Sequence, residues 1–208
     1  MRIRPAESRD AEPIAAIYRP YVAGTVITFE TDPPSADEFR RRMSGPEGLP
    51  MPWLVAEERS VDPADAGRER VVGYAYASRH RDRAAYRWSA DVSIYLDLAI
   101  RGRGIGRALY AALIPRVRAL GYFSLYAGIT VPNPASVGIH ESMGFRFVGV
   151  YRSVGYKAMP GEPGRWLDVA WYELAAAGAA GDPGLVGEPG VAGLPNPPAE
   201  PLAWDAPQ

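Results

Sequence analysis

The chain has 208 residues, a length that suits one domain with a full hydrophobic core. Its formal net charge is −1, so no global field favours nucleic acid or an anionic membrane, and any affinity for anions must be local. It contains no cysteine, which excludes disulfides, thiolate metal sites and a thioester formed on the protein. We expect no bound metal.

The N-terminal segment MRIRPAESRD has no apolar signal core, and no stretch approaches 18 apolar residues. We therefore expect a cytoplasmic protein that neither crosses a membrane nor binds nucleic acid.

The first third of the chain predicts two helices between short strands. Ser8 is the expected cap of the first helix, which ends near Tyr21. Ser35 and Glu38 have the spacing of a capping box and predict a second helix that ends at Met43. The strands expected around these helices are residues 2–5, 53–56 and 71–78.

The remainder of the domain alternates strands with helices. Apolar residues recur at helical spacing after Ile105, and Gly121 ends this helix. Asn133 before Pro134 predicts another helix start, and Gly144 closes that helix. The expected strands are residues 88–98, 124–131, 145–154 and 167–174. This order predicts an α/β (α+β) domain, residues 1–176, with a single mixed central sheet flanked by helices.

The C-terminal tail, residues 177–208, has a different composition. Glycine recurs at every third position from Gly178 to Gly193, which is the period of collagen. Six triplets are too few for a stable triple helix. We expect a disordered or polyproline-like extension.

A glycine- and arginine-rich stretch lies between a predicted strand and a predicted helix. The first amides of a helix are unpaired, its dipole favours anions, and glycines let an anion approach the backbone. The spacing matches neither the lysine-containing phosphate loop nor the dinucleotide fingerprint. A tight strand–helix turn explains the glycines equally well. The residues of this candidate pyrophosphate cradle are Arg101, Gly102, Arg103, Gly104, Ile105, Gly106 and Arg107.

The pattern Arg101-x-x-Gly104-x-Gly106 resembles the acetyl-CoA loop of the GNAT acetyltransferases. About thirty residues later, Asn133 and His140 occupy positions where that superfamily has an asparagine and often a tyrosine. The stretches YRWSADVSIYLDLAIRGRGIG, VPNPASVGIHESMGF and GRWLDVAWYEL look more narrowly like the phosphinothricin N-acetyltransferases and the related methionine sulfoximine/sulfone acetyltransferases. The resemblance covers about residues 2–174 and implies the GNAT acyl-CoA N-acyltransferase fold.

The resemblance implies acetyl-CoA as co-substrate, with its pyrophosphate on the glycine amides. The pantetheine arm would lie beside the strand at residues 94–96, and a backbone amide near Tyr95 or Leu96 would stabilise the oxyanion. Asn133 is also explained by helix capping alone. The contacts expected along the arm are Ile94, Tyr95, Leu96, Asn133 and Ser136.

Two residues are the candidate catalytic groups. His140 would give a proton to the leaving thiolate, because imidazole titrates close to neutral pH. Asp91 stands where the resembling enzymes have a glutamate proposed as base, and its shorter side chain favours a relay through water. The alternatives are a packed helix histidine and a strand-end aspartate with local hydrogen bonds.

A basic loop supplies the candidate substrate contacts Arg81, Arg83 and Tyr86. The arginine fork binds two oxygens of a carboxylate or phosphinate at once, although a solvated basic loop has the same composition. His80 stands where the resembling enzymes have an aromatic residue. Residues 158–163, AMPGEP, are an insertion that borders the substrate side in that family.

The sequence therefore predicts an acetyl-CoA-dependent N-acetyltransferase that acts by direct transfer on the α-amino group of a small amino acid. The substrate class implied is phosphinothricin or methionine sulfoximine/sulfone, and the resemblance implies a homodimer. The alternatives are the same fold acting on another small amine and a non-catalytic acetyl-CoA-binding module. The basic residues 79–87 disfavour an aminoglycoside, which would require carboxylates.

Overall fold

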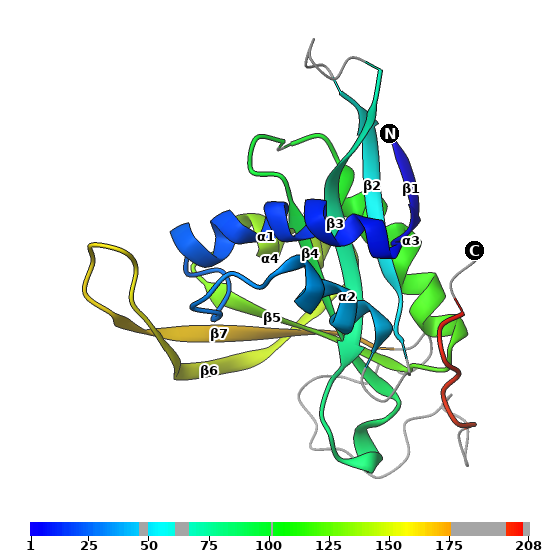
Figure 1. The fold of residues 1–208 in the computed structure, drawn as a ribbon. Coiled ribbons are helices and arrows are strands. Elements are labelled where there is room, and N and C mark those ends of the chain that lie inside the picture. The colour runs from blue at the N-terminus through cyan, green and yellow to red at the C-terminus, as the bar shows by residue number, and fades with distance from the viewer. Residues whose placement is uncertain (46–49, 61–66, 101, 176–198, 206–208) are drawn as a thin grey trace.

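The computed structural model describes residues 1–45, 50–60, 67–100, 102–175 and 199–205. A single seven-stranded sheet in the order β1-β2-β3-β4-β5-β7-β6 organises the molecule (Figure 1). Only β4 and β5 pair in parallel; the other neighbours are antiparallel, so the predicted single mixed sheet is confirmed. The strands are β1 (Arg2–Pro5), β2 (Trp53–Arg59), β3 (Glu69–Arg79), β4 (Ser89–Leu96), β5 (Ser124–Val131), β6 (Arg146–Lys157) and β7 (Arg165–Leu174).

Helices cover both faces of the sheet. They are α1 (Ala11–Gly24), α2 (Ala36–Ser44), α3 (Ile105–Ala119) and α4 (Pro134–Ser142). Leu54 and Val55 are neighbours in β2 and both fully buried, yet they belong to different core clusters, because successive strand residues point to opposite faces. Val55 packs in the cluster that α1 and α2 contribute to, and Leu54 in the cluster of α3 (Figure 1).

The start of α1 differs from the prediction. Ser8 is not a cap: it begins a short 3-10 turn, and Glu7 and Asp10 form the capping box instead. Buried Arg4 donates to Asp10 at 2.6 Å and to Glu57 at 2.5 Å, and these bonds raise the pKa of Arg4. Because this ion pair anchors Asp10 to β1 and β2, α1 begins at Ala11 and continues to Gly24.

The hairpin of β2 and β3 is longer than the apolar residues predicted. Charged residues continue the ladder toward solvent, with Glu58 opposite Arg70 and Arg59 opposite Glu69. Cross-strand pairs of opposite charge support strand structure without apolar side chains. The bounds of β1 and β5 match their predictions.

The described part of the C-terminal tail, residues 199–205, makes contacts with the domain. Residues 176–198, which contain most of the glycine triplets, lie outside the described residues. Leu202 N donates to Leu120 O at 2.8 Å, and Trp204 N donates to Pro50 O at 3.1 Å. The indole of Trp88 donates to Ala199 O at 2.8 Å. Residues 199–205 therefore form a C-terminal segment that lies on the domain.

Candidate active site

The strands β4 and β5 pair only at their first residues and then separate. Their pairs run from Ser89 and Ser124 to Asp91 and Tyr126, although both strands continue for at least five residues more. The separated edges, residues 92–95 and 127–130, border a narrow cavity of about 50 Å³. Strand edges without a strand neighbour expose backbone groups that can bind an extended ligand. We call this opening the fork.

The glycine loop precedes α3 beside the fork. Gly102 and Gly104 have φ of 70° and 74°, the left-handed region that favours glycine, and Gly104 is the N-terminal cap of α3. A Cβ at either position would meet nothing within 4 Å, so the backbone there is open to a ligand. The unpaired amides and the dipole of α3 make this a place for an anion. Arg101 lies outside the described residues.

Gly106 and Ile105 have a different role from the two glycines before them. A Cβ on Gly106 would lie 2.7 Å from Ile139 and 3.1 Å from Ile94. The missing side chain therefore lets α4 and β4 pack against α3. Ile105 is buried in the core. These two residues therefore serve packing and do not line the cavity.

The positive charge of the loop is smaller than the sequence indicated. Arg103 forms a two-bond ion pair with Glu58 of β2, at 2.8 and 2.9 Å. Its charge is balanced within the protein. Arg107 is exposed on the first turn of α3 and remains available to a ligand.

His140 lies buried on α4 between two hydrogen-bond partners, and it lines the fork cavity. Its Nδ1 is 2.7 Å from the carbonyl of Ser136; a carbonyl only accepts, so Nδ1 carries a proton. Nε2 then accepts from Tyr110 Oη at 2.9 Å. Burial lowers the pKa of His140, so the ring is neutral at neutral pH. Tyr110, which sequence reasoning missed, is a fully buried residue of α3.

The expected arm contacts lie along the same cavity. Ile94 and Tyr95 line it from β4, whereas Leu96 lies beyond it and accepts from Tyr21 Oη at 2.7 Å. Asn133 accepts from Ser136 N at 3.1 Å, which confirms its capping role. Its amide nitrogen is not used in that bond.

A second cavity of about 430 Å³ lies over β5 and β7, with residues 27–29 on its other side. It is lined by Val169 and Trp171 of β7. It shares Ile27, Tyr95, Gly128 and Thr130 with the fork cavity, so the two spaces meet at the edge of β5. The indole nitrogen of Trp171 is buried and has no hydrogen-bond partner among the described residues. An oxygen of a ligand would satisfy it.

Asp91 occupies the closed end of the fork, at the last β4–β5 pair. It accepts a hydrogen bond from Nδ1 of His80, at 2.6 Å. Burial raises the pKa of Asp91, and the bond from His80 opposes that rise. Sequence reasoning noted His80 only for the aromatic residue it replaces. The hairpin register, which places His80 opposite Ser89, is the signal that could have joined the two residues.

The basic loop divides into residues near the second cavity and residues away from it. The guanidinium of Arg81 lies over the ring of Trp171, 5.4 Å from its centroid. Tyr86 contacts the ring of His80 edge-on. Neither arginine lines the second cavity itself: Arg81 reaches it only through Trp171, and Arg83 lies in the exposed turn before the 3-10 helix Ala84–Tyr86.

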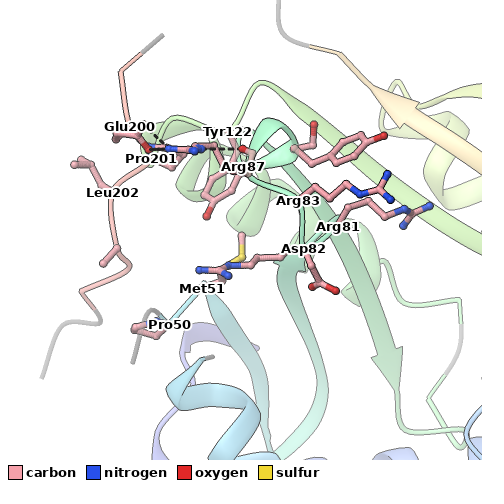
Figure 2. A pocket seen from close by; sticks show the side chains of 15 residues that line it. Pro50, Met51, Arg81, Asp82, Arg83, Arg87, Tyr122, Glu200, Pro201 and Leu202 are labelled. Atoms are coloured by element: carbon pink, nitrogen blue, oxygen red, sulfur yellow. Dashed lines mark hydrogen bonds and ion pairs between the residues drawn. The ribbon is translucent and has the colours of Figure 1, made fainter. Parts of the chain in front are cut away.

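The same loop borders a third cavity of about 300 Å³, closed on one side by the C-terminal segment. Figure 2 shows Arg87 paired with Glu200 there, at 2.7 Å, while Arg81 and Arg83 extend away from the segment.

The inserted residues 158–163 lie beside the end of α1. Met159, Pro160 and Glu162 share a cavity with residues 23–27. Ile27 lines this cavity, the fork and the second cavity. The insertion therefore lies near the second cavity, and Ile27 connects the two. Among the described residues no cluster of ligands suits a metal ion, and no helix is long and apolar enough to cross a membrane.

The sequence of this chain is similar to those of known acetyltransferases. The family model described as an acetyltransferase (GNAT) domain matches residues 3–171. The chain is 40% identical to a phosphinothricin N-acetyltransferase of Streptomyces coelicolor over 174 residues, which is 83% of this chain and 95% of that protein. It is 32% identical to an L-methionine sulfoximine/L-methionine sulfone acetyltransferase of Salmonella typhimurium, covering 84% and 94% of the two chains.

Among solved structures, the chain is similar to a GNAT superfamily phosphinothricin acetyltransferase from Sinorhizobium meliloti in complex with AcCoA. The two share 37% identity and superpose with a TM-score of 0.72, over 92% of this chain and 95% of the other. The seven-stranded sheet and its flanking helices are thus the GNAT fold.

Proposed function

Because this chain belongs to the GNAT acetyltransferase family, we propose that it acetylates the α-amino group of a small amino acid of the phosphinothricin or methionine sulfoximine type. It is an N-acetyltransferase, and acetyl-CoA is its acetyl donor. The observation that carries the proposal is the fork between β4 and β5. This opening has the glycine loop beside it and the Asp91–His80 pair at its closed end, and it joins the second cavity.

The residues along the fork suit acetyl-CoA. The open backbone at Gly102 and Gly104 can accept a pyrophosphate without a side chain in the way, and Arg107 adds positive charge. The released edge of β4 can pair with the amide groups of a pantetheine arm. The thioester would then lie between Tyr95 and the second cavity, where the spaces meet.

Acetyl transfer proceeds in this proposal by direct attack of the amine within a ternary complex. The sequence has no cysteine that could form an intermediate thioester, which supports direct transfer. A backbone amide at Tyr95 or Leu96 would stabilise the oxyanion. Asp91 would take part in removing the proton from the substrate amine.

The thiolate would receive its proton from the pair of Tyr110 and His140. A neutral His140 has its Nδ1 proton bonded to Ser136, so the proton given to sulfur would be that of the Tyr110 hydroxyl, and the tyrosine would regain a proton from solvent after the thiol leaves. Burial raises the pKa of Tyr110, which opposes this transfer. His140 acts in this proposal as a relay partner. This differs from the charged imidazole that the sequence alone favoured.

The second cavity suits a small zwitterion. Arg81, held over Trp171, offers a charged fork for a carboxylate or phosphinate, and the indole nitrogen of Trp171 offers one more donor. Val169 and Gly128 leave the rest of the space apolar and small. Such a lining favours a short amino acid with a polar head over a large cation.

A thiol-release assay with acetyl-CoA and a panel of amines tests the function. Phosphinothricin, methionine sulfoximine and methionine sulfone should be acetylated, and product mass with fragmentation should place the acetyl group on the α-nitrogen. Activity confined to polyamines or other simple amines would instead show the same fold serving another substrate class. Acetyl-CoA binding by calorimetry without release of thiol on any amine would indicate a binding module.

We also propose that two copies of the chain associate through β6 and β7. These strands project from the body of the molecule (Figure 1) and carry exposed apolar side chains on both faces. An apolar surface of this kind marks an interaction site. The residues are Phe147, Val148, Tyr151, Val154, Tyr156 and Trp166, each about half exposed or more.

Light scattering should give a mass of twice 22.6 kDa at assay concentration. The double change Tyr156→Ser and Trp166→Ser should shift the mass toward the monomer. A wild-type chain that scatters only as a monomer would contradict the association.

A further inference from the structure

His80 and Asp91 meet at the closed end of the fork. His80 extends the register of β3 opposite Ser89, so its side chain falls on the same sheet face as Asp91. Its ring stacks on Tyr126 at 4.3 Å between centroids, and Tyr126 is the partner of Asp91 in the last β4–β5 pair. The imidazole therefore covers the rung at which the strands separate.

The ring of His80 is held in one orientation. Tyr86 and Trp171 contact it edge-on, at 6.0 and 5.9 Å between centroids, and its side chain is only 12% exposed. Trp171 also lines the second cavity, so one side chain separates the imidazole from the space proposed for the amine. Aromatic contacts on three sides and one short hydrogen bond leave it little freedom to rotate.

The hydrogen bond to Asp91 assigns the chemistry of the two ring nitrogens. A carboxylate accepts, so Nδ1 carries the proton and Nε2 keeps its lone pair. Within the described part of the chain, Nε2 has no hydrogen-bond partner and is not a buried unpartnered atom. It is thus a base with a free lone pair whose tautomer a half-buried carboxylate maintains, the arrangement used by catalytic histidines.

The neighbouring charges are compatible with this role. Arg81 faces the pair from the adjoining loop, and Glu173 of β7 lies behind Tyr126, whose hydroxyl donates to it at 3.2 Å. Burial raises the pKa of Tyr126 to about 12, so this phenol stays neutral. Tyr86 is the remaining titratable group beside the ring.

We propose that Nε2 of His80 is the general base that takes the proton from the substrate ammonium, and that Asp91 positions its ring. The assignment rests on the proposed function. The ammonium gives one proton to Nε2, and the freed nitrogen lone pair attacks the thioester carbon. The C–N bond forms, the C–S bond breaks, and its electron pair leaves on sulfur. A second proton leaves the nitrogen and balances the one that the thiolate takes up, while His80 returns its proton to solvent.

Kinetics of acetyl transfer against pH test the assignment, with wild type, His80→Phe, His80→Gln and Asp91→Asn. In wild type, kcat/KM for the amine should fall at acid pH, because a protonated imidazole cannot accept the proton. His80→Phe keeps an aromatic ring against Tyr126 and should lower kcat by about 10²–10⁴-fold, the usual range for loss of a general base. The fall of kcat/KM at acid pH, the acidic limb of the profile, should disappear. KM for acetyl-CoA should stay the same.

Asp91→Asn separates positioning from direct catalysis. The amide cannot hold Nδ1–H as a carboxylate does, so kcat should fall while the acidic limb persists and moves to lower pH. An acidic limb that vanishes in Asp91→Asn and persists in His80→Phe would assign the proton to Asp91 and overturn the proposal. Retention of wild-type kcat and pH profile by both His80 variants would also overturn it.

Nitrogen NMR of the histidines gives a readout that needs no activity. The chain has only two histidines, so His80→Phe assigns both sets of signals. His80 should show a protonated Nδ1 and a bare Nε2, and Asp91→Asn should disturb that preference. The opposite tautomer in wild type would end the assignment. Absence of acetyl transfer to every amine, with the expected tautomer, would instead overturn the proposed function alone.

Discussion

At the scale of single residues, the three glycines before and within α3 are present for different reasons. Gly102 and Gly104 need a left-handed backbone and face open space, whereas Gly106 is required by the approach of Ile139. The sequence pattern contains all three without separating these causes. Substitutions can separate them.

Gly104→Asp and Gly104→Asn form a matched pair for the anion site. Both side chains tolerate the left-handed backbone better than most, and they differ only in charge. Gly104→Asp should raise KM for acetyl-CoA by at least about tenfold more than Gly104→Asn, because its carboxylate repels the pyrophosphate by about 1.4 kcal/mol or more. Calorimetry with acetyl-CoA checks this, and equal affinities for the two variants would remove the phosphate from this loop.

Arg81 and Arg83 are a second matched pair, two residues apart in one exposed loop. Only Arg81 lies against Trp171, so Arg81→Ala should raise KM for the amino acid by about 10–150-fold, the equivalent of a charged hydrogen bond of about 1.5–3 kcal/mol. Arg83→Ala should change it little. KM for acetyl-CoA should stay constant in both variants.

The amine that corresponds to the amino acid without its carboxylate is the control substrate. Its KM should be the same in wild type and Arg81→Ala, because it has no carboxylate for Arg81 to bind. If Arg83→Ala rather than Arg81→Ala lost the preference for the amino acid over this amine, the assignment of the two arginines would be reversed.

At the scale of elements, a buried hydrogen bond between Tyr110 and His140 joins α3 to α4. Burial lowers the pKa of His140 in the folded protein, while the unfolded chain has an ordinary value near 6.5. Above that value both states are neutral, and the stability is fully present. As the pH falls below about 6.5, the unfolded state binds a proton that the folded state resists, so stability is lost.

Urea unfolding should therefore show a free energy of unfolding that decreases between pH 7.5 and pH 5.5 by up to about 1.4 kcal/mol per pH unit. The measurement is cleanest in His80→Phe, where His140 is the only histidine left. The double variant His80→Phe/His140→Phe should lose most of this slope. Parallel slopes in the single and double variants would show that His140 does not resist protonation.

At the scale of the whole molecule, the C-terminal segment joins elements distant in sequence. It bonds to the backbone after α3 and to the residues before β2, and the indole of Trp204 packs against the main core. Removing the C-terminal segment should expose Trp88. The fork cavity and the second cavity should stay unchanged, because no residue of the segment lines either of them.

A chain truncated after Ala177 should therefore melt about 2–8 °C lower than the full chain, the shift expected for roughly 1–2 kcal/mol at this size. It should retain kcat and both KM values. Trp204→Ala in the full chain should reproduce part of the shift. Identical melting curves for the full and truncated chains would show that the segment contributes nothing to stability.

Local signals in the sequence determined much of this protein. Asn133 before Pro134 predicts the start of α4, and the glycines predict the turn into α3, because capping and backbone conformation depend on residues a few positions apart. The bounds of β1 and β5 follow from local side-chain patterning in the same way, and the single mixed sheet follows from the order of the elements and from the family resemblance. Together with the acetyl-CoA loop pattern, these signals identify the family.

The tertiary structure decided which side chains act together. The separation of β4 from β5, the ion pair of Arg103 with Glu58 and the bond of His80 to Asp91 all join residues on different strands. Such contacts depend on register and on the space left by neighbouring side chains, which no local pattern encodes. For this reason the sequence could propose an acetyl-CoA site from a local pattern, and only the fold brought the proposed base to its carboxylate.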